Sequence, residues 1–199
     1  MKKFIDLHLH LDGSVPVATV KKLMKEHNMP ALSDEELRQE LSVDSSCKSL
    51  DQFLEKFALP NKLMQTRHDL ETIVYDLLVE LKQQGLVYAE IRFAPQLHTK
   101  KGLTQEDAIE AVISGLNKFL ADQKKQKTLP ELHAGLILCL MRFADNQKQN
   151  METVKLAKKF LGKGVVGLDL AGAEGPIPNI KYKSFFDKAK KLDVPYTIH

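Results

Sequence analysis

Short apolar runs alternate with longer amphipathic segments along most of this 199-residue chain. A strand, a helix and a second strand in succession favour a parallel sheet, because a parallel connection needs a long crossover. The pattern therefore predicts an α/β fold with about five strands. We expect the strands at Phe4–His10, Val87–Ala94, Ala134–Met141, Val165–Ala171 and Pro195–His199.

The intervals between the later strands carry signals for helices. Apolar residues recur at helical spacing from Leu70 to Leu81, and Gly85 is suited to end that helix. Thr104 is a suitable N-cap for the next helix. Two further helices are expected from apolar residues at helical spacing, which are Val154, Phe160 and Leu161, and then Phe185, Ala189 and Leu192.

The segment from about residue 14 to residue 67 departs from this alternation and predicts a helical insertion after the first strand. Ser14 and Pro16 begin one helix, and a capping box at Ser33 begins the next. A third helix carries an apolar stripe of Leu50, Phe53, Leu54 and Phe57. An insertion at a polar strand end is suited to a lid, although ordinary core packing explains the stripe equally well. We treat residues 1–199 as one domain.

Composition excludes several classes of protein. With 43% hydrophobic and 28% charged residues, the chain is expected to fold and to be globular. The net charge of +3 comes without a basic stripe interleaved with aromatic residues, so we expect no nucleic-acid partner. The densest lysine run, Lys124–Lys127, is interpreted as a solvated helix end or loop. No stretch approaches the ~18 apolar residues of a membrane span.

The two cysteines and the first residues bear on the compartment. Cys47 and Cys139 suggest no disulfide framework, so a reducing compartment, the cytoplasm, is expected. Asp6, His8 and His10 interrupt the apolar region that a signal peptide would need.

The first expected strand places two imidazoles on one face. Alternate residues of a strand share a face, so Asp6, His8, His10 and Asp12 point one way. Leu7, Leu9 and Leu11 point the other way. Two neutral imidazoles on one face can chelate a divalent ion. The alternative interpretation is a strand with one solvated face.

The carboxyl ends of parallel strands gather ligands in α/β proteins. His199 ends the fifth expected strand, so a metal site could form from His8, His10 and His199. Three protein ligands leave an open position for water, which is typical of a catalytic ion rather than a structural one.

Other polar residues are assigned structural roles. We expect His27, His68, His98 and His133 to be surface or capping residues, since they lack ligand spacing. Arg92 and Arg142 could bind an anion, but pairing with carboxylates of neighbouring strands is favoured. Gly172 could let a ligand approach the backbone, or could simply form a tight turn.

At this point the chain resembles the adenosine deaminase family, within the metal-dependent amidohydrolase superfamily of TIM (β/α)8 barrels. The similar motifs occur in the family's order and cover essentially the whole chain. They are His8–Ser14, Leu50–Phe57, Val87–Pro95, Gly167–Gly172 and Tyr196–His199.

The resemblance implies a function and a set of residue roles. The reaction would be the hydrolytic loss of the amino group from C6 of adenosine, which yields inosine and ammonia in purine nucleoside metabolism. One zinc ion would be held by His8, His10 and His199, with His10 also next to the substrate. Asp12 would bind the ribose, and the backbone of Gly172 would contact the purine. The lid over the nucleoside would be Leu50, Phe53, Leu54 and Phe57.

The chain departs from the family in two respects. Ala173 stands where the family commonly has an acidic residue, which leaves fine substrate preference open. The family's barrel has eight strands and a catalytic glutamate that would follow His199, so we expect the N-terminal portion of a deaminase, with no general acid–base residue of its own. Such an incomplete barrel is expected to have little activity alone, and its exposed sheet edge would favour self-association.

Two alternatives remain open. One is a related deaminase that acts on adenine or on an N6-substituted adenine nucleotide. The other is a half-barrel without catalytic activity.

Overall fold

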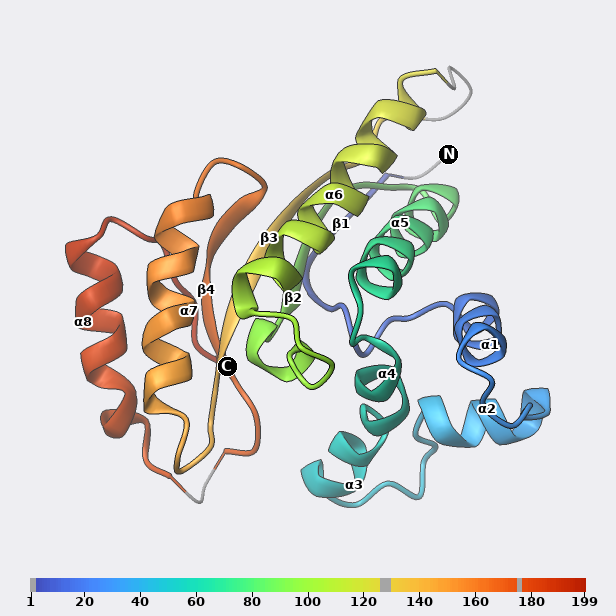
Figure 1. Ribbon diagram of the computed structural model, residues 1–199, viewed down its shortest axis with the longest axis horizontal. Helices are drawn as coiled ribbons and strands as arrows, with labels where there is room; N and C mark the ends of the chain where they lie inside the picture. The colour runs from blue at the N-terminus through green and yellow to red at the C-terminus, as the bar shows by residue number, and fades with distance from the viewer. Residues whose placement is uncertain (1–2, 126–129, 175–176) are drawn as a thin grey trace.

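A single parallel sheet organises the protein. The computed structural model describes residues 3–125, 130–174 and 177–199, so Gln126 and Lys127 of the lysine run and Gly175 lie outside the described residues. The strands are β1 (Phe4–His10), β2 (Leu86–Phe93), β3 (His133–Met141) and β4 (Val165–Ala171). Each strand pairs in parallel with the next one along the chain, in the order β1-β2-β3-β4 (Figure 1). The predicted parallel α/β architecture is confirmed.

The fifth expected strand, Pro195–His199, is not a full strand, and the prediction was wrong in this respect. Its contact with β4 is one parallel bridge between Leu168 and Tyr196. The N–H of Leu168 donates to the Pro195 carbonyl and the N–H of Thr197 donates to the Leu168 carbonyl, both at 2.9 Å. Among the described residues, the segment's pairing with β4 is thus an isolated bridge and not a continuous ladder.

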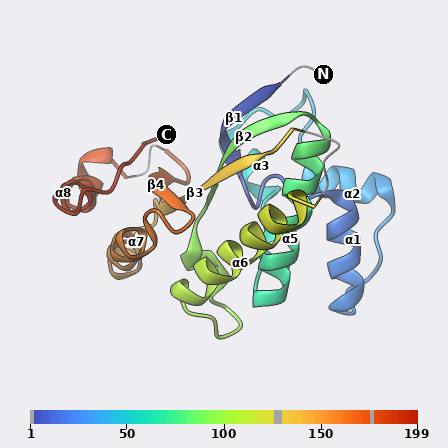
Figure 2. The ribbon, with the colours of Figure 1, turned by 90° about the horizontal axis from the view of Figure 1, so that it is seen from above.

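Helices cover one face of the curved sheet, as Figure 2 shows for α5, α6 and α7. Thr104 caps α6 through a capping box with Asp107, as predicted. An unpredicted capping box of Thr66 with Asp69 begins α5. The helices that alternate with the strands are α5 (Arg67–Gln83), α6 (Gln105–Gln123), α7 (Gln147–Phe160) and α8 (Lys183–Lys191), with short 3-10 helices η1 (Pro95–His98) and η2 (Asn179–Tyr182).

The insertion after β1 contains four helices rather than the expected three. They are α1 (Val17–Glu26), α2 (Asp34–Leu41), α3 (Leu50–Glu55) and α4 (Ala58–Leu63). The Ser33 capping box of α2 is confirmed. The fourth helix, α4, was not predicted. Pro60 lies in the first turn, where a backbone N–H has no intrahelical partner in any case.

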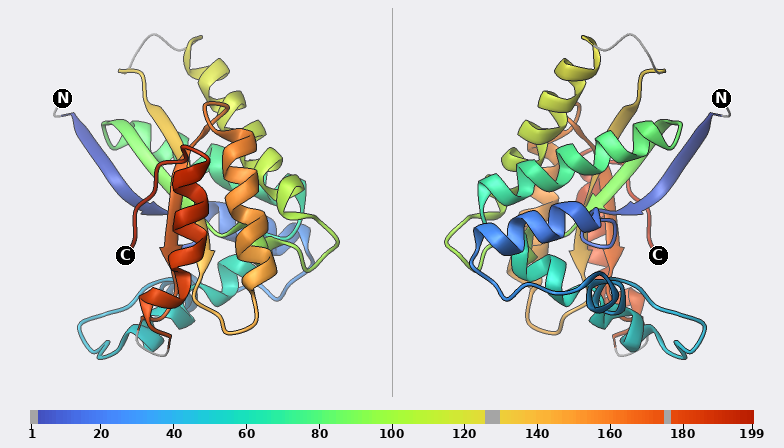
Figure 3. Two further views of the ribbon diagram at one scale, coloured as in Figure 1. Left: turned by 90° about the vertical axis from the view of Figure 1, so that its left-hand side faces the viewer. Right: turned by 90° about the vertical axis from the view of Figure 1, so that its right-hand side faces the viewer.

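The position of the insertion matters for function. Figure 3 shows α2, α3 and α4 at the end of the molecule toward which the strands point. Ligands gather at this end of parallel sheets. The insertion therefore lies where it can cover a site at the carboxyl ends of the strands.

The outer part of β1 is exposed. β1 is an edge strand, and Figure 3 shows its first half extending away from the helices. Phe4, Ile5 and Leu7 are 49%, 65% and 54% exposed, whereas Leu11 is fully buried. The expected apolar face of this strand is thus covered only toward its carboxyl end.

No helix among residues 3–125, 130–174 and 177–199 combines the length and apolar character needed to cross a membrane.

Candidate metal centre and its surroundings

Two histidines of β1 and a third that is distant in the sequence converge at the carboxyl end of β1. His8 and His10 come from β1, and His199 comes from the segment that follows α8. One ring nitrogen from each side chain lies within 4.8 Å of the corresponding nitrogens of the others. The ring centroid of His199 is 4.4 Å from that of His8 and 5.1 Å from that of His10. The structure brings together the three residues that the sequence pattern proposed as ligands.

A buried carboxylate orients His199. The Nδ1 atom of His199 lies 2.6 Å from Oδ2 of Asp169, and Asp169 is fully buried on β4. A hydrogen bond at Nδ1 leaves Nε2 as the ligand atom, and such a partner fixes both ring orientation and tautomer. Burial alone would raise the pKa of Asp169, but the hydrogen bond from His199 and the nearby Arg92 hold that pKa below its usual value. The carboxylate therefore remains charged beside the imidazole.

Arg92 supports the same centre from β2. Its guanidinium pairs with Asp169 and donates to the Leu7 carbonyl at 2.8 Å. Arg142 follows β3 and donates to the His199 carbonyl at 3.0 Å and to the side chain of Asn179. The predicted pairing with a strand carboxylate is confirmed for Arg92. It was wrong for Arg142, whose partners among the described residues are an amide and a carbonyl.

The two β1 histidines are held in the neutral form that binds metals. Burial, together with the neighbouring His199, His8 and Arg92, lowers the pKa of His10 to about 4. Burial and the charge of Arg92 also lower the pKa of His8. A neutral imidazole offers its ring nitrogen lone pair at neutral pH without competition from a proton.

The donor set fits a catalytic zinc ion better than a structural one. Zinc binds imidazole nitrogen at ~2.0–2.1 Å, and catalytic sites use three protein ligands and leave the fourth position for water. Three imidazoles with a carboxylate partner behind one of them match that description. The residues present therefore fit the metal that the resemblance implies.

Asp12 lies two residues beyond His10 and is 8% exposed. Burial raises the pKa of Asp12 to about 6, although the hydrogen bond from Asn61 opposes this shift. Its carboxylate lines a small cavity beside Gly13, Phe53 and Phe57. An acceptor therefore sits next to the histidine cluster.

The apolar stripe of the insertion is more exposed than ordinary core packing would leave it. Leu50 and Phe53 are 48% and 43% exposed, and α3 has no buried residue. Phe57 approaches His10 edge-on at 6.1 Å between ring centroids, and Phe53 contacts Phe57 at 5.4 Å. This exposure argues against ordinary core packing, while the function of the stripe as a lid stays a prediction.

Gly172 follows β4 with a positive φ of 105°, a conformation that L side chains rarely adopt. A Cβ atom there would lie 3.3 Å from the backbone nitrogen of Arg142. The tight turn is thus a property of the structure, and the contact of Gly172 with a purine stays a prediction.

His98 was expected at the surface, and this prediction was wrong. His98 is 0% exposed and stacks on Phe93, with 6.0 Å between ring centroids. Burial lowers its pKa to about 4. The available signal was its position in an apolar stretch directly after β2, beside Leu97.

The other three histidines meet the expectation more closely. His27 bonds the buried Asp69 at 2.9 Å, and His68 pairs with Glu26 at 3.1 Å. His133 is exposed at the start of β3.

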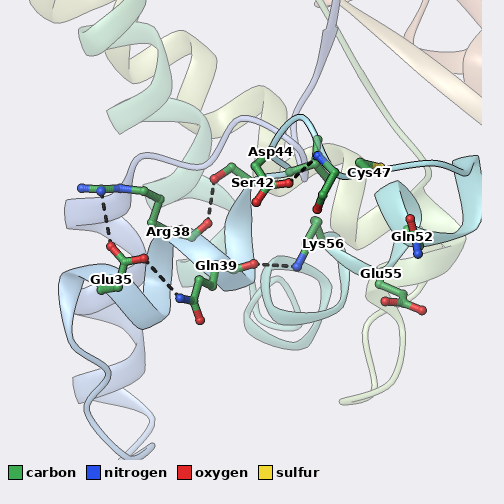
Figure 4. A pocket seen from close by; sticks show the side chains of 11 residues that line it. Glu35, Arg38, Gln39, Ser42, Asp44, Cys47, Gln52, Glu55 and Lys56 are labelled. Carbon is green, nitrogen blue, oxygen red and sulfur yellow. Dashed lines mark hydrogen bonds and ion pairs between the residues drawn. The ribbon is translucent and has the colours of Figure 1, made fainter.

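A separate polar cavity lies within the insertion (Figure 4). It is lined by residues 35–56 of α2, α3 and the connecting loop, including Cys47. Lys56 donates to the Gln39 carbonyl at 2.6 Å and so ties the end of α3 to α2. None of the three clustered histidines lines this cavity, which makes it a feature of the insertion's own packing.

The comparisons with known proteins identify the family. The family model described as adenosine deaminase matches residues 4–199. The chain belongs to the adenosine deaminase family. It is 48% identical over 200 residues to an adenosine deaminase of Haemophilus ducreyi, a match that covers 98% of this chain and 56% of that protein. The chain thus spans little more than half the length of this relative.

Solved structures show the same architecture. The complex of ADAL from arabidopsis with IMP superposes with a TM-score of 0.79 at 25% identity, over 98% of this chain and 57% of that one. An amidohydrolase solved with bound Zn from Burkhoderia ambifaria also gives 0.79, at 20% identity, over 98% of this chain and 51% of that one. Both matches show that this chain shares the fold of these two proteins over nearly its whole length.

Proposed function

We propose that this protein serves the zinc-dependent hydrolytic deamination of adenosine to inosine and ammonia. The observation that supports it most strongly is the convergence of His8, His10 and His199, with Asp169 behind His199. Family membership and the 48% identity to an adenosine deaminase favour adenosine as the substrate.

The proposed metal is one zinc ion, held by His8, His10 and His199. When bound, zinc supplies the activation of water for hydrolysis. The residues of this chain do the remaining work. Asp169 keeps His199 in the ligating tautomer, and the low pKa of His10 keeps its ring unprotonated. We assign no general acid–base residue within this chain, and a glutamate that follows His199 is our proposal for that role.

The substrate side of the site uses the other residues named from the sequence. The Asp12 carboxylate accepts a hydrogen bond from a ribose hydroxyl, and the backbone at Gly172 contacts the purine. Leu50, Phe53, Leu54 and Phe57 cover the nucleoside and exclude water. The partner is thus a small purine nucleoside, and the free Cys47 and Cys139 fit a cytoplasmic location.

The test compares substrates and forms of the protein. The zinc-loaded protein expressed from its complete reading frame should convert adenosine to inosine, as followed by absorbance, faster than it acts on adenine or on N6-methyl-AMP. The 199-residue chain alone should show little or no turnover. A clear preference for adenine or the nucleotide would replace adenosine with the related activity.

A second candidate is a half-barrel without catalytic activity that associates with a second copy of itself. The exposed Phe4, Ile5 and Leu7 on edge strand β1 favour this alternative, because an unpaired apolar edge is a template for pairing. Analytical ultracentrifugation of the 199-residue chain would show a dimer whose dissociation is promoted by Ile5→Lys.

A further inference from the structure

The side chain of Asn61 on α4 connects the insertion to the end of β1. Its Nδ2 atom lies 3.3 Å from Oδ2 of Asp12 and 3.0 Å from the carbonyl oxygen of Phe57. An asparagine amide has two N–H donors. Both are therefore engaged, one by the carboxylate and one by the main chain of the apolar stripe.

Two buried acceptor atoms remain beside this link. Oδ1 of Asp12 and Oδ1 of Asn61 have no hydrogen-bond partner among the described residues. Two acceptors cannot satisfy each other, and a buried acceptor without a donor is destabilising. The group that completes them must therefore bring an O–H or N–H donor.

The location narrows the choice of donor. Asp12 lines its cavity together with Phe53 and Phe57, and it follows His10 by two residues. Phe57 is seated over Gly13, where a Cβ atom would lie 3.0 Å from its ring. A substrate hydroxyl that donates to Asp12 would therefore bring the substrate against the aromatic side chains of Phe53 and Phe57.

We propose that Asn61 is a positioning residue that holds the Asp12 carboxylate so that Oδ1 faces a hydroxyl of the substrate. This inference rests on the proposed function and deepens it. The amide is a neutral donor, so it orients the carboxylate without neutralising its charge. The same nitrogen also bonds the Phe57 carbonyl, which the main-chain N–H of Asn61 bonds as well, so the side chain that holds Asp12 is itself fixed to the turn that carries Phe57.

The experiment measures kcat/KM for four substrates with the zinc-loaded protein from its complete reading frame. The substrates are adenosine and its 2′-, 3′- and 5′-deoxy analogues. With the parent protein, the analogue whose kcat/KM falls most identifies the hydroxyl that donates to Asp12. Asn61→Ala should lower kcat/KM for adenosine about 10- to 100-fold, mainly through KM. The loss should be several-fold smaller for the analogue that lacks the hydroxyl in question.

The ratio of kcat/KM for adenosine to kcat/KM for each analogue does not depend on how much of the variant is folded. A change in this ratio therefore cannot result from partial unfolding of the variant. Asn61→Asp keeps the side-chain size but places a second carboxylate against Asp12, so its ratio should fall at least as far. The exposed Asn117 on α6 offers a matched control, and Asn117→Ala should leave all four values unchanged.

The outcomes separate the two proposals. Equal losses on all four substrates, or no loss, would show that Asn61 is only structural and would overturn the inference alone. If the parent protein does not deaminate adenosine, the same four compounds are compared by calorimetric binding. Hydroxyl-dependent binding that Asn61→Ala abolishes would then retain the inference and reject the proposed function. Binding without hydroxyl dependence would reject both.

Discussion

Oδ2 of Asp169 accepts a hydrogen bond from Nδ1 of His199 at 2.6 Å, and the same oxygen forms an ion pair with the guanidinium of Arg92. One buried oxygen on β4 thereby orients a metal ligand from the end of the chain and a cation from β2. Because Asp169 has no exposure to water, its charge is stabilised by these two partners and by the N–H of Leu170, which donates to Oδ1 at 2.8 Å. The metal centre and the sheet are coupled through this carboxylate.

Asp169→Asn should weaken zinc binding about 10- to 100-fold, since a partner behind a metal-ligating histidine raises its basicity and fixes its tautomer. The measurement is a competition between the purified protein and a chromogenic chelator. Asp145→Asn, at an exposed aspartate after β3, is the matched control and should bind zinc as the parent does. Unchanged affinity in Asp169→Asn would mean that the hydrogen bond does not support the ligand.

Arg92→Met should reduce the free energy of unfolding by about 3–5 kcal/mol, because it leaves the buried Asp169 without its cation. Urea unfolding followed by circular dichroism gives the value. Arg38 offers a control, since its side chain is 72% exposed in its pair with Glu35. Arg38→Met should cost no more than ~1 kcal/mol. Equal effects of the two substitutions would contradict a special role for the buried pair.

His98 should make the protein less stable in acid. Folded His98 gains its proton only at a pKa of about 4, whereas the ordinary value is 6.5. Between these values the unfolded chain holds more protons, so stability is lost as the pH falls from 6.5 toward 4, by up to about 3 kcal/mol. Above pH 6.5 this contribution is fully present. The measurement is urea unfolding at several pH values in that window.

The variant for this test is His98→Gln, because glutamine does not titrate. Its free energy of unfolding should fall less steeply between pH 6.5 and pH 4 than that of the parent, whatever the effect of the substitution at pH 7. The exposed His133 serves as the control, because its side chain contacts water in both the folded and the unfolded chain. A profile in His98→Gln as steep as that of the parent would assign the acid sensitivity to other groups.

Gly115→Ala on α6 should destabilise the protein by about 1–3 kcal/mol through overpacking. Alanine favours helices over glycine by ~1 kcal/mol, so an exposed site would show the opposite sign. Here the added Cβ would meet the side chain of Val74 and lie 2.5 Å from the Glu71 carbonyl oxygen on α5. Thermal unfolding gives the sign, and Ser114→Ala on the exposed side of α6 is the comparison. A stabilised Gly115→Ala would show that α5 and α6 can separate without cost.

Local signals in the sequence were sufficient for much of the fold. The alternation of apolar runs with helical periodicity predicted the parallel sheet, and the capping boxes at Ser33 and Thr104 marked real helix starts. Such signals work because they act over a few residues, within one turn of helix or one strand. Helix α4 was not predicted from such signals, and its Pro60 is compatible with a helix because it lies in the first turn.

The sequence by itself determined the pair His8 and His10, because a strand places alternate residues on one face whatever surrounds it. Only the tertiary structure decided which groups meet that pair. The burial of His98, the bond from Asp169 to His199 and the link from Asn61 to Asp12 join residues far apart in the chain or depend on what packs around them. These relationships follow from how the strands and the insertion pack, and no spacing along one segment encodes them.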